Sequence, residues 1–152
     1  MTISEKEFNE SEINTIAEEI LAYLNENKSL TEATLLTMSG DLGAGKTALS
    51  AAIARALGVI GHVISPTFLI QKKYNLHNSH LKNWKNLIHI DAYRLDNSSE
   101  LTNLGWQEFL NDPENLIILE WPERVSEILP DSHHKIHLEH TPNNTRIINA
   151  IL

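Results

Sequence analysis

Residues 40–47 of the chain read GDLGAGKT, a spacing of residue types that is typical of phosphate binding. Gly40, Gly43, Gly45, Lys46 and Thr47 satisfy the pattern G-x-x-x-x-G-K-[ST]. Glycines let consecutive backbone amides turn inward around phosphate oxygens, through turns that a β-carbon would forbid. A helix that follows the loop adds its N-terminal amides and its dipole to the same anion. The octet therefore predicts a nucleotide site.

Each part of this loop has an expected role. The backbone of eight consecutive residues is expected to hold the phosphates of ATP, namely Gly40, Asp41, Leu42, Gly43, Ala44, Gly45, Lys46 and Thr47. The Lys46 ammonium is expected to reach the β- and γ-phosphates, where it would assist catalysis. The Thr47 hydroxyl is expected to ligate Mg²⁺.

Two acidic residues are candidates for the carboxylate that holds Mg²⁺ together with Thr47. A P-loop site needs a carboxylate at the end of a nearby strand, which usually holds Mg²⁺ through water. Asp91 and Glu120 both qualify, because each ends a short apolar run, NLIHID at 86–91 and NLIILE at 115–120. Both runs are expected to lie next to the P-loop strand, with their carboxyl ends at the ligand. Spacing alone leaves open which acid holds the metal and which orients the attacking water.

The residues around the loop predict the elements that position it. The short apolar run at 33–39 is consistent with a buried strand, and residues 46–57 are rich in alanine and leucine, with Gly58 as a helix stop. Apolar residues at helical spacing predict an amphipathic helix over 10–25, preceded by a capping pair at Asn9 and Glu12. The order is strand, glycine loop and helix.

The remaining segments complete an α/β pattern. Residues 67–76 predict a strand, and leucines between 101 and 110 suggest a helical segment broken near Gly105. The alternating tail segments 134–141 and 145–152 flank PNN, which indicates a hairpin. We therefore expect one P-loop NTPase domain over residues 1–152, with a mainly parallel central sheet, antiparallel C-terminal strands and helices on both faces.

Composition narrows the classes of function. The 152 residues are 41% hydrophobic and 21% charged, which is ordinary for a globular protein. The net charge of −8 opposes indiscriminate binding to nucleic acid, and the lysines between residues 72 and 85 are interpreted as a solvated hairpin face. No segment approaches the roughly 18 apolar residues of a membrane span. With no cysteine, the expected compartment is the cytoplasm, and no membrane partner is expected.

Four histidines near the C-terminus raise the alternative of a metal site. They are His133, His134, His137 and His140. On a strand, His133 and His137 share one face while His134 and His140 share the other, so the four ligands are divided. No cysteine or tight acid cluster completes a site there. A solvent-facing strand is the preferred interpretation.

Motifs outside the P-loop indicate which class of P-loop protein the chain belongs to. A GTPase would carry N-K-x-D for guanine, whereas residues 83–86 read NWKN, and Asp91 is followed by Ala-Tyr-Arg with no switch glycine. A small-molecule kinase usually needs a lid with several arginines, and the chain has four arginines in all. A slow ATPase that does work on a partner is favoured. A small-molecule phosphotransferase is the alternative, and a regulatory nucleotide-binding module without turnover is a weaker third.

Several motifs in series resemble one known family. They are GDLGAGKT, SPTF, HIDAYRL, ELTNLGWQEFL, LEWPERV and ILP, in that order. Over roughly residues 34–140 the chain resembles the TsaE (YjeE) family. The resemblance implies a cytoplasmic Mg²⁺-dependent ATPase needed for the threonylcarbamoyl modification of adenosine 37 (t6A37) in tRNAs that read ANN codons. It also implies that the chain works with TsaB and TsaD, while direct contact with tRNA is left open.

The resemblance also assigns roles by position. It implies that the P-loop holds the phosphates, that Thr47 and Glu120 coordinate Mg²⁺, and that Asp91 is required for hydrolysis. Thr67 resembles a switch residue, and Trp121 resembles the tryptophan that follows the metal-binding acid. The family often has F-D-x-Y-R where this chain has Ile90 before Asp91, a departure that leaves the acid in place.

Overall fold

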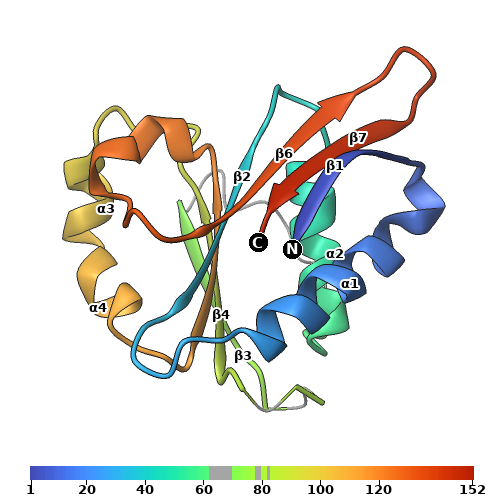
Figure 1. Cartoon of the computed structure of the whole chain (residues 1–152). Coiled ribbons are helices and arrows are strands. Elements are labelled where there is room, and N and C mark those ends of the chain that lie inside the picture. Colours follow the sequence, from blue (N-terminus) through green and yellow to red (C-terminus); the bar gives the residue numbers. More distant parts are fainter. Residues whose placement is uncertain (62–69, 78–79, 82) are drawn as a thin grey trace.

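Strands of the described chain form one mixed sheet in the order β1-β7-β6-β2-β5-β4-β3, as the computed structural model in Figure 1 shows. The strands are β1 (Thr2–Phe8), β2 (Thr34–Ser39), β3 (Gln71–Asn75), β4 (Asn86–Asp91), β5 (Asn115–Glu120), β6 (His134–His140) and β7 (Arg146–Ile151). The structure describes residues 1–61, 70–77, 80–81 and 83–152.

The centre of the sheet is parallel and its margins are antiparallel. The P-loop strand β2 pairs in parallel with β5 on one side and β6 on the other, and β4 pairs in parallel with β5. The C-terminal strand β7 runs antiparallel to β6 and β1, and β3 runs antiparallel to β4. The expected α/β fold is confirmed. Side chains of β2 and β5 are buried along nearly the whole of each strand, as expected for central parallel strands covered on both faces.

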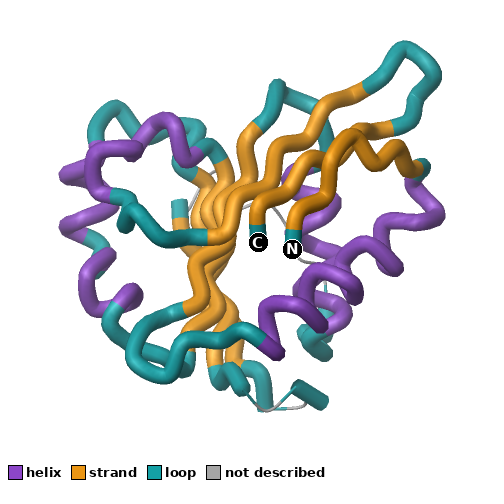
Figure 2. The backbone as a smooth tube through the Cα atoms, viewed as in Figure 1, coloured by secondary structure: helices purple, strands orange, loops and turns teal. Residues whose placement is uncertain are grey.

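Helices cover both faces of the sheet, as expected (Figure 2). One face carries α1 (Ile13–Glu26) and α2 (Lys46–Ala56), whose apolar side chains share one buried cluster with β2, β5 and β6. The other face carries α3 (Ser98–Asn103), α4 (Trp106–Leu110) and the 3₁₀ segment η2 (Pro122–Ile128), packed on a second cluster. These two layers bury the central strands, whose carboxyl ends lie beside the P-loop.

Local signals explain where the helices begin and end. The Asn9–Glu12 capping box forms as expected, but the first turn is a short 3₁₀ helix, η1 (Glu10–Glu12), before α1 begins. Gly105 lies in the left-handed region with φ of 91° and separates α3 from α4, which confirms the predicted break. Gly58, with φ of 81°, follows the end of α2.

Two strands differ from the sequence expectation. The strand β1 was not predicted, because its segment TISEKEF is mostly polar and gains its place by pairing with β7 at the sheet edge. The predicted strand over 67–76 is found as β3 over Gln71–Asn75, and residues 62–69, with Ser65, Pro66 and Thr67, lie outside the described residues. No helix in the described ranges is long and apolar enough to cross a membrane.

Candidate nucleotide-binding site

The glycine loop joins the end of β2 to the start of α2 at the carboxyl edge of the sheet. Gly40, Gly43 and Gly45 all have positive φ, of 131°, 83° and 106°. A β-carbon on Gly40 would lie 2.1 Å from the carbonyl oxygen of Leu138, so the loop can approach β6 only with glycine there. Gly45 occupies the N-cap of α2. The loop therefore has the backbone geometry that a phosphate cradle requires.

Lys46 is turned into the loop. Its residue is only 5% exposed, and its Nζ donates hydrogen bonds to the carbonyl oxygens of Gly40 at 2.5 Å and Asp41 at 2.9 Å. Nζ also lies 3.9 Å from the centroid of the Trp121 ring. Burial lowers the pKa of Lys46, and nearby carboxylates, with Glu120 the strongest, oppose that shift. The ammonium is thus held at the loop by neutral acceptors and an aromatic face.

Glu120 ends β5 and is bonded at both carboxylate oxygens. Oε2 accepts a hydrogen bond of 3.0 Å from the hydroxyl of Thr47. Oε1 accepts one of 2.9 Å from the hydroxyl of Ser50, and lies 2.7 Å from Nε2 of His89. Glu120 and His89 are each 1% exposed. The contacts with Ser50 and His89 therefore fix Oε1, and the contact with Thr47 joins Oε2 to the first turn of α2.

Asp91 lies beside Glu120, on the next strand. The two residues are paired in the parallel register of β4 and β5, and Oδ1 of Asp91 accepts a hydrogen bond of 3.0 Å from the backbone of Tyr93. The expectation that both acidic strands neighbour the P-loop strand is wrong for β4, because β5 lies between β4 and β2. Glu120 is therefore the acid in direct contact with Thr47, and Asp91 stands one strand further away.

Trp121 adopts an unusual backbone conformation directly after Glu120. Its φ of 61° and ψ of 52° place a non-glycine residue in the left-handed region, and its amide donates to the carbonyl of Met38 at 3.1 Å. The turn brings its ring beside Tyr93, at 4.9 Å between centroids, and over Lys46. Such strain is found at ligand sites, where the surrounding structure fixes the conformation.

These groups share one hollow of about 410 Å³ at the carboxyl edge of the sheet. Its lining residues are Leu42, Gly43, Gly45, Lys46, Thr47, Ala48, Asp91, Tyr93, Glu120, Trp121 and Arg146. Three expected loop residues, Gly40, Asp41 and Ala44, do not line it; Ala44 is buried and Leu42 is largely exposed. The sequence-predicted acids, lysine and threonine thus come together around one cavity.

Three further residues at this site were missed from the sequence. His89 and Ser50 bond to Glu120, and Arg146 lines the hollow from the first position of β7. His89 carried a signal, because a histidine inside the apolar run NLIHID is a polar group that needs a buried partner. Nothing in the local sequence distinguishes Ser50 or Arg146 from ordinary helix and strand residues.

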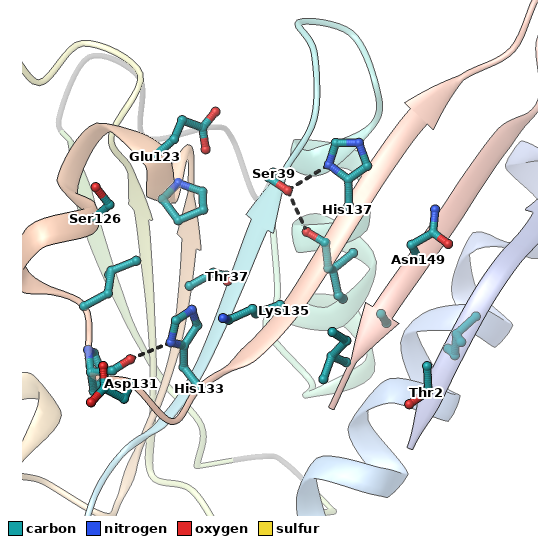
Figure 3. Close-up of a pocket in the computed structure, with 17 residues that line it drawn as sticks. Thr2, Thr37, Ser39, Glu123, Ser126, Asp131, His133, Lys135, His137 and Asn149 are labelled. Carbon is teal, nitrogen blue, oxygen red and sulfur yellow. Dashed lines mark hydrogen bonds between the residues drawn. The ribbon is translucent and has the colours of Figure 1, made fainter.

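A larger hollow, of about 770 Å³, lies on the sheet face between η2 and the strands β6, β7 and β1 (Figure 3). His133 and His137 both line it, which confirms that they share a face, while His134 lies on the other face with its ring edge-on to Tyr23. Nδ1 of His137 bonds to the Ser39 hydroxyl at 2.9 Å (Figure 3). No group of three or more His, Cys, Asp or Glu residues placed to hold a metal ion occurs within the described ranges.

The geometry agrees with a family match over nearly the whole chain. Residues 8–148 match the family model described as threonylcarbamoyl adenosine biosynthesis protein TsaE. Relatives named tRNA threonylcarbamoyladenosine biosynthesis protein TsaE include that of Haemophilus influenzae, 31% identical over 80% of this chain and 70% of the relative. The Bacillus subtilis relative is 35% identical over 75% and 66% of the two chains, and that of Streptomyces coelicolor 36% identical over 78% and 76%.

A solved structure has the same fold. The crystal structure of Bacillus subtilis YdiB superposes with a TM-score of 0.70 at 27% sequence identity. The match covers 99% of this chain and 86% of the YdiB chain. The likeness therefore extends over the sheet and both helical layers, as well as over the P-loop.

Proposed function

The chain belongs to the TsaE family of threonylcarbamoyl adenosine biosynthesis proteins, and from this premise we propose that it binds Mg²⁺ and ATP at its P-loop and hydrolyses the ATP. The hydrolysis serves the threonylcarbamoyladenosine modification of tRNA, the process that the names of its relatives state. The observation that carries the proposal is the 3.0 Å contact between Thr47 Oγ1 and Glu120 Oε2, beside the buried ammonium of Lys46.

The loop supports nucleotide binding. Its three glycines provide the left-handed turns that point backbone amides at a phosphate, and α2 begins directly behind them. The Lys46 ammonium is held at the mouth of the same loop by two carbonyl oxygens. A phosphate oxygen is a stronger partner than a carbonyl for this cation, because the resulting hydrogen bond joins two charged groups.

The donor set supports Mg²⁺ as the metal. Thr47 and Glu120 would hold it, since both present oxygen atoms to the hollow, and Mg²⁺ in nucleotide sites binds few protein ligands, with phosphates and water completing its shell. When bound, the ion neutralises the charge that develops on the phosphates. Ser50 and His89 keep the Glu120 carboxylate aimed at Thr47.

Asp91 is proposed to orient the attacking water. It lines the same hollow as Glu120, but its strand β4 is one strand further from the P-loop strand β2. A carboxylate at that position can accept a proton from water while Glu120 stays with the metal. The two acids, which spacing alone could not tell apart, thus receive different roles.

The protein partners follow from the family and its pathway. We propose that TsaB and TsaD are the partners whose cycle the ATPase drives, and that turnover by the isolated chain is weak. This proposal rests on the family to which the chain belongs.

The test is an ATPase assay with γ-labelled ATP and Mg²⁺, with and without purified TsaB and TsaD. We expect slow release of labelled inorganic phosphate that rises when both partners are added, and loss of t6A37 from tRNA in cells depleted of the chain. Transfer of label to a small acceptor would establish the alternative phosphotransferase instead. Unchanged tRNA in depleted cells would refute the pathway assignment.

A further inference from the structure

The larger hollow lies on a part of the sheet that the second helical layer does not cover. The apolar cluster beneath α3, α4 and η2 includes residues of β2, β4 and β5, but among the described residues it includes none from β6, β7 or β1. The segment η2 and the loop after it form one wall of the hollow, and β6 forms the opposite wall (Figure 3). The space between these walls, about 770 Å³, is of the size that binding sites have.

The two walls carry charges of opposite sign. Glu123 and Asp131 lie at the two ends of the η2 wall, and Lys135 lines the hollow from β6, between His133 and His137 (Figure 3). No ion pair within the described ranges includes Glu123, Asp131 or Lys135, so opposite charges face one space without meeting. An occupant that bridges the walls is complementary if it presents positive charge to η2 and negative charge to β6.

The length of the hollow fits an extended peptide. The β6 wall from His133 to His137 spans about 13 Å at the rise of a strand, which is the length of about four or five extended residues. Successive side chains of an extended chain point in opposite directions, so one set would face η2 and the other would face β6. Alternating basic and acidic residues therefore match both walls, whereas a purely basic or purely acidic segment would meet like charge on one of them.

Both walls continue directly into the nucleotide site. On the β6 wall, Nδ1 of His137 lies 2.9 Å from the hydroxyl of Ser39, which immediately precedes Gly40, the first glycine of the P-loop. On the other wall, η2 begins directly after Trp121, whose ring centroid lies 3.9 Å from Nζ of Lys46. A segment held between the walls therefore contacts elements on both sides of the P-loop.

We propose that this hollow docks an extended segment of the protein partner that stimulates the ATPase, an inference that rests on the proposed function. The segment carries basic side chains toward Glu123 and Asp131, and acidic side chains toward Lys135. Charges arranged in this way select one partner, because a segment with another charge order brings like charges together, which is costly. Docking joins η2 to β6 and so connects partner binding to the nucleotide site.

The test measures binding of the purified TsaB–TsaD complex to the chain by calorimetry, and the ATPase rate with and without that complex. Asp131→Lys and Lys135→Glu are each expected to weaken binding about tenfold and to lower the stimulated rate at limiting partner, because each brings like charges together. Neither residue lines the nucleotide hollow, so the rate without partners should be unchanged. Glu26→Lys is the matched control for Asp131→Lys, because Glu26 is exposed on α1, which covers the opposite face of the sheet.

The double variant Asp131→Lys/Lys135→Glu separates the local charge pattern from overall charge. It keeps the net charge of −8, and we expect it to bind at least as weakly as either single variant. Binding as tight as that of the wild type would show that only net charge matters and would overturn the proposal. Tighter binding of Lys135→Glu would overturn it too, because it would indicate a purely basic segment.

The remaining outcomes separate this inference from the function on which it rests. Unchanged binding and stimulation in both single variants, with the fold checked by thermal melting, would show that the partner docks elsewhere and would overturn the proposal. Failure of the wild-type chain to hydrolyse ATP or to bind the complex would instead count against the proposed function.

Discussion

His89 Nε2 lies 2.7 Å from Glu120 Oε1, and this contact fixes the carboxylate that faces Thr47. Both side chains are buried, and Nδ1 of His89 has no hydrogen-bond partner in the described chain. The histidine therefore acts on the site through Glu120, as a positioning residue.

We expect His89→Phe to raise the apparent Kd for Mg²⁺ about tenfold in the presence of ATP, because outer partners of metal ligands usually contribute that much. Binding of ATP without Mg²⁺ should be unchanged. Calorimetric Mg²⁺ titrations of the ATP-saturated chain measure the effect. Ser50→Ala, which removes the other bond to the same oxygen, serves as a comparison, and unchanged Mg²⁺ affinity in both variants would remove His89 and Ser50 from the site.

Substitutions of Asp91 and Glu120 should have different effects on binding and hydrolysis. Asp91→Asn is expected to leave Mg²⁺–ATP binding intact and to slow hydrolysis about 100-fold or more, the usual range for a lost general base. Glu120→Gln should raise the Mg²⁺ concentration needed for binding as well as slow hydrolysis, because it removes a charged ligand. Phosphate-release rates measured over a range of Mg²⁺ concentrations distinguish the two. If extra Mg²⁺ restores the rate of the Asp91 variant and not that of the Glu120 variant, Asp91 holds the metal and Glu120 orients the water.

Lys46→Ala should weaken ATP binding by about 10- to 100-fold, since hydrogen bonds to charged groups contribute roughly 1.5–3 kcal/mol. The loss should be much smaller for AMP, which lacks the β- and γ-phosphates. Lys85→Ala is a suitable control, because Lys85 is exposed and pairs with Glu114 on the surface. Equal loss for ATP and AMP would indicate damage to the loop rather than loss of a phosphate contact.

Gly40→Ala should destabilise the fold strongly, because the new β-carbon would lie 2.1 Å from a backbone oxygen of β6. We expect a loss of about 3 kcal/mol or more from the combined strain and overpacking. Gly61→Ala has a similar positive φ with nothing within 4 Å, so its cost should be about 1 kcal/mol. Urea unfolding of both variants measures the difference. Similar midpoints would show that the approach to Leu138 is not restrictive.

Protonation of His134 should make the folded chain less stable as the pH is lowered. Burial lowers the pKa of His134, with smaller effects of the same sign from His133 and the N-terminus. The unfolded chain therefore takes up this proton at a higher pH than the folded chain. The contribution of neutral His134 to the free energy of unfolding is complete above about pH 6.5 and is lost as the pH falls below it. Melting temperatures between pH 8 and pH 5 should decline less in His134→Gln than in the wild type, or in the exposed-site control His140→Gln.

The sequence by itself determined the glycine loop and most of the helices and strands, although not β1. Glycines at fixed spacing can be recognised without the fold, because they report local backbone turns, and Gly40, Gly43 and Gly45 all have positive φ in the structure. Apolar runs and the break at Gly105 likewise express local preferences. The family resemblance is confirmed by the match over residues 8–148.

Only the tertiary structure decided which side chains meet at the site. Asp91 and Glu120 end runs that look alike, and the strand order, which depends on long-range pairing, places just one of them against Thr47. The positions of His89 and Arg146 were decided in the same way, since their neighbours at the site are distant in the chain. A local pattern specifies what a segment becomes, whereas packing between segments specifies which side chains meet.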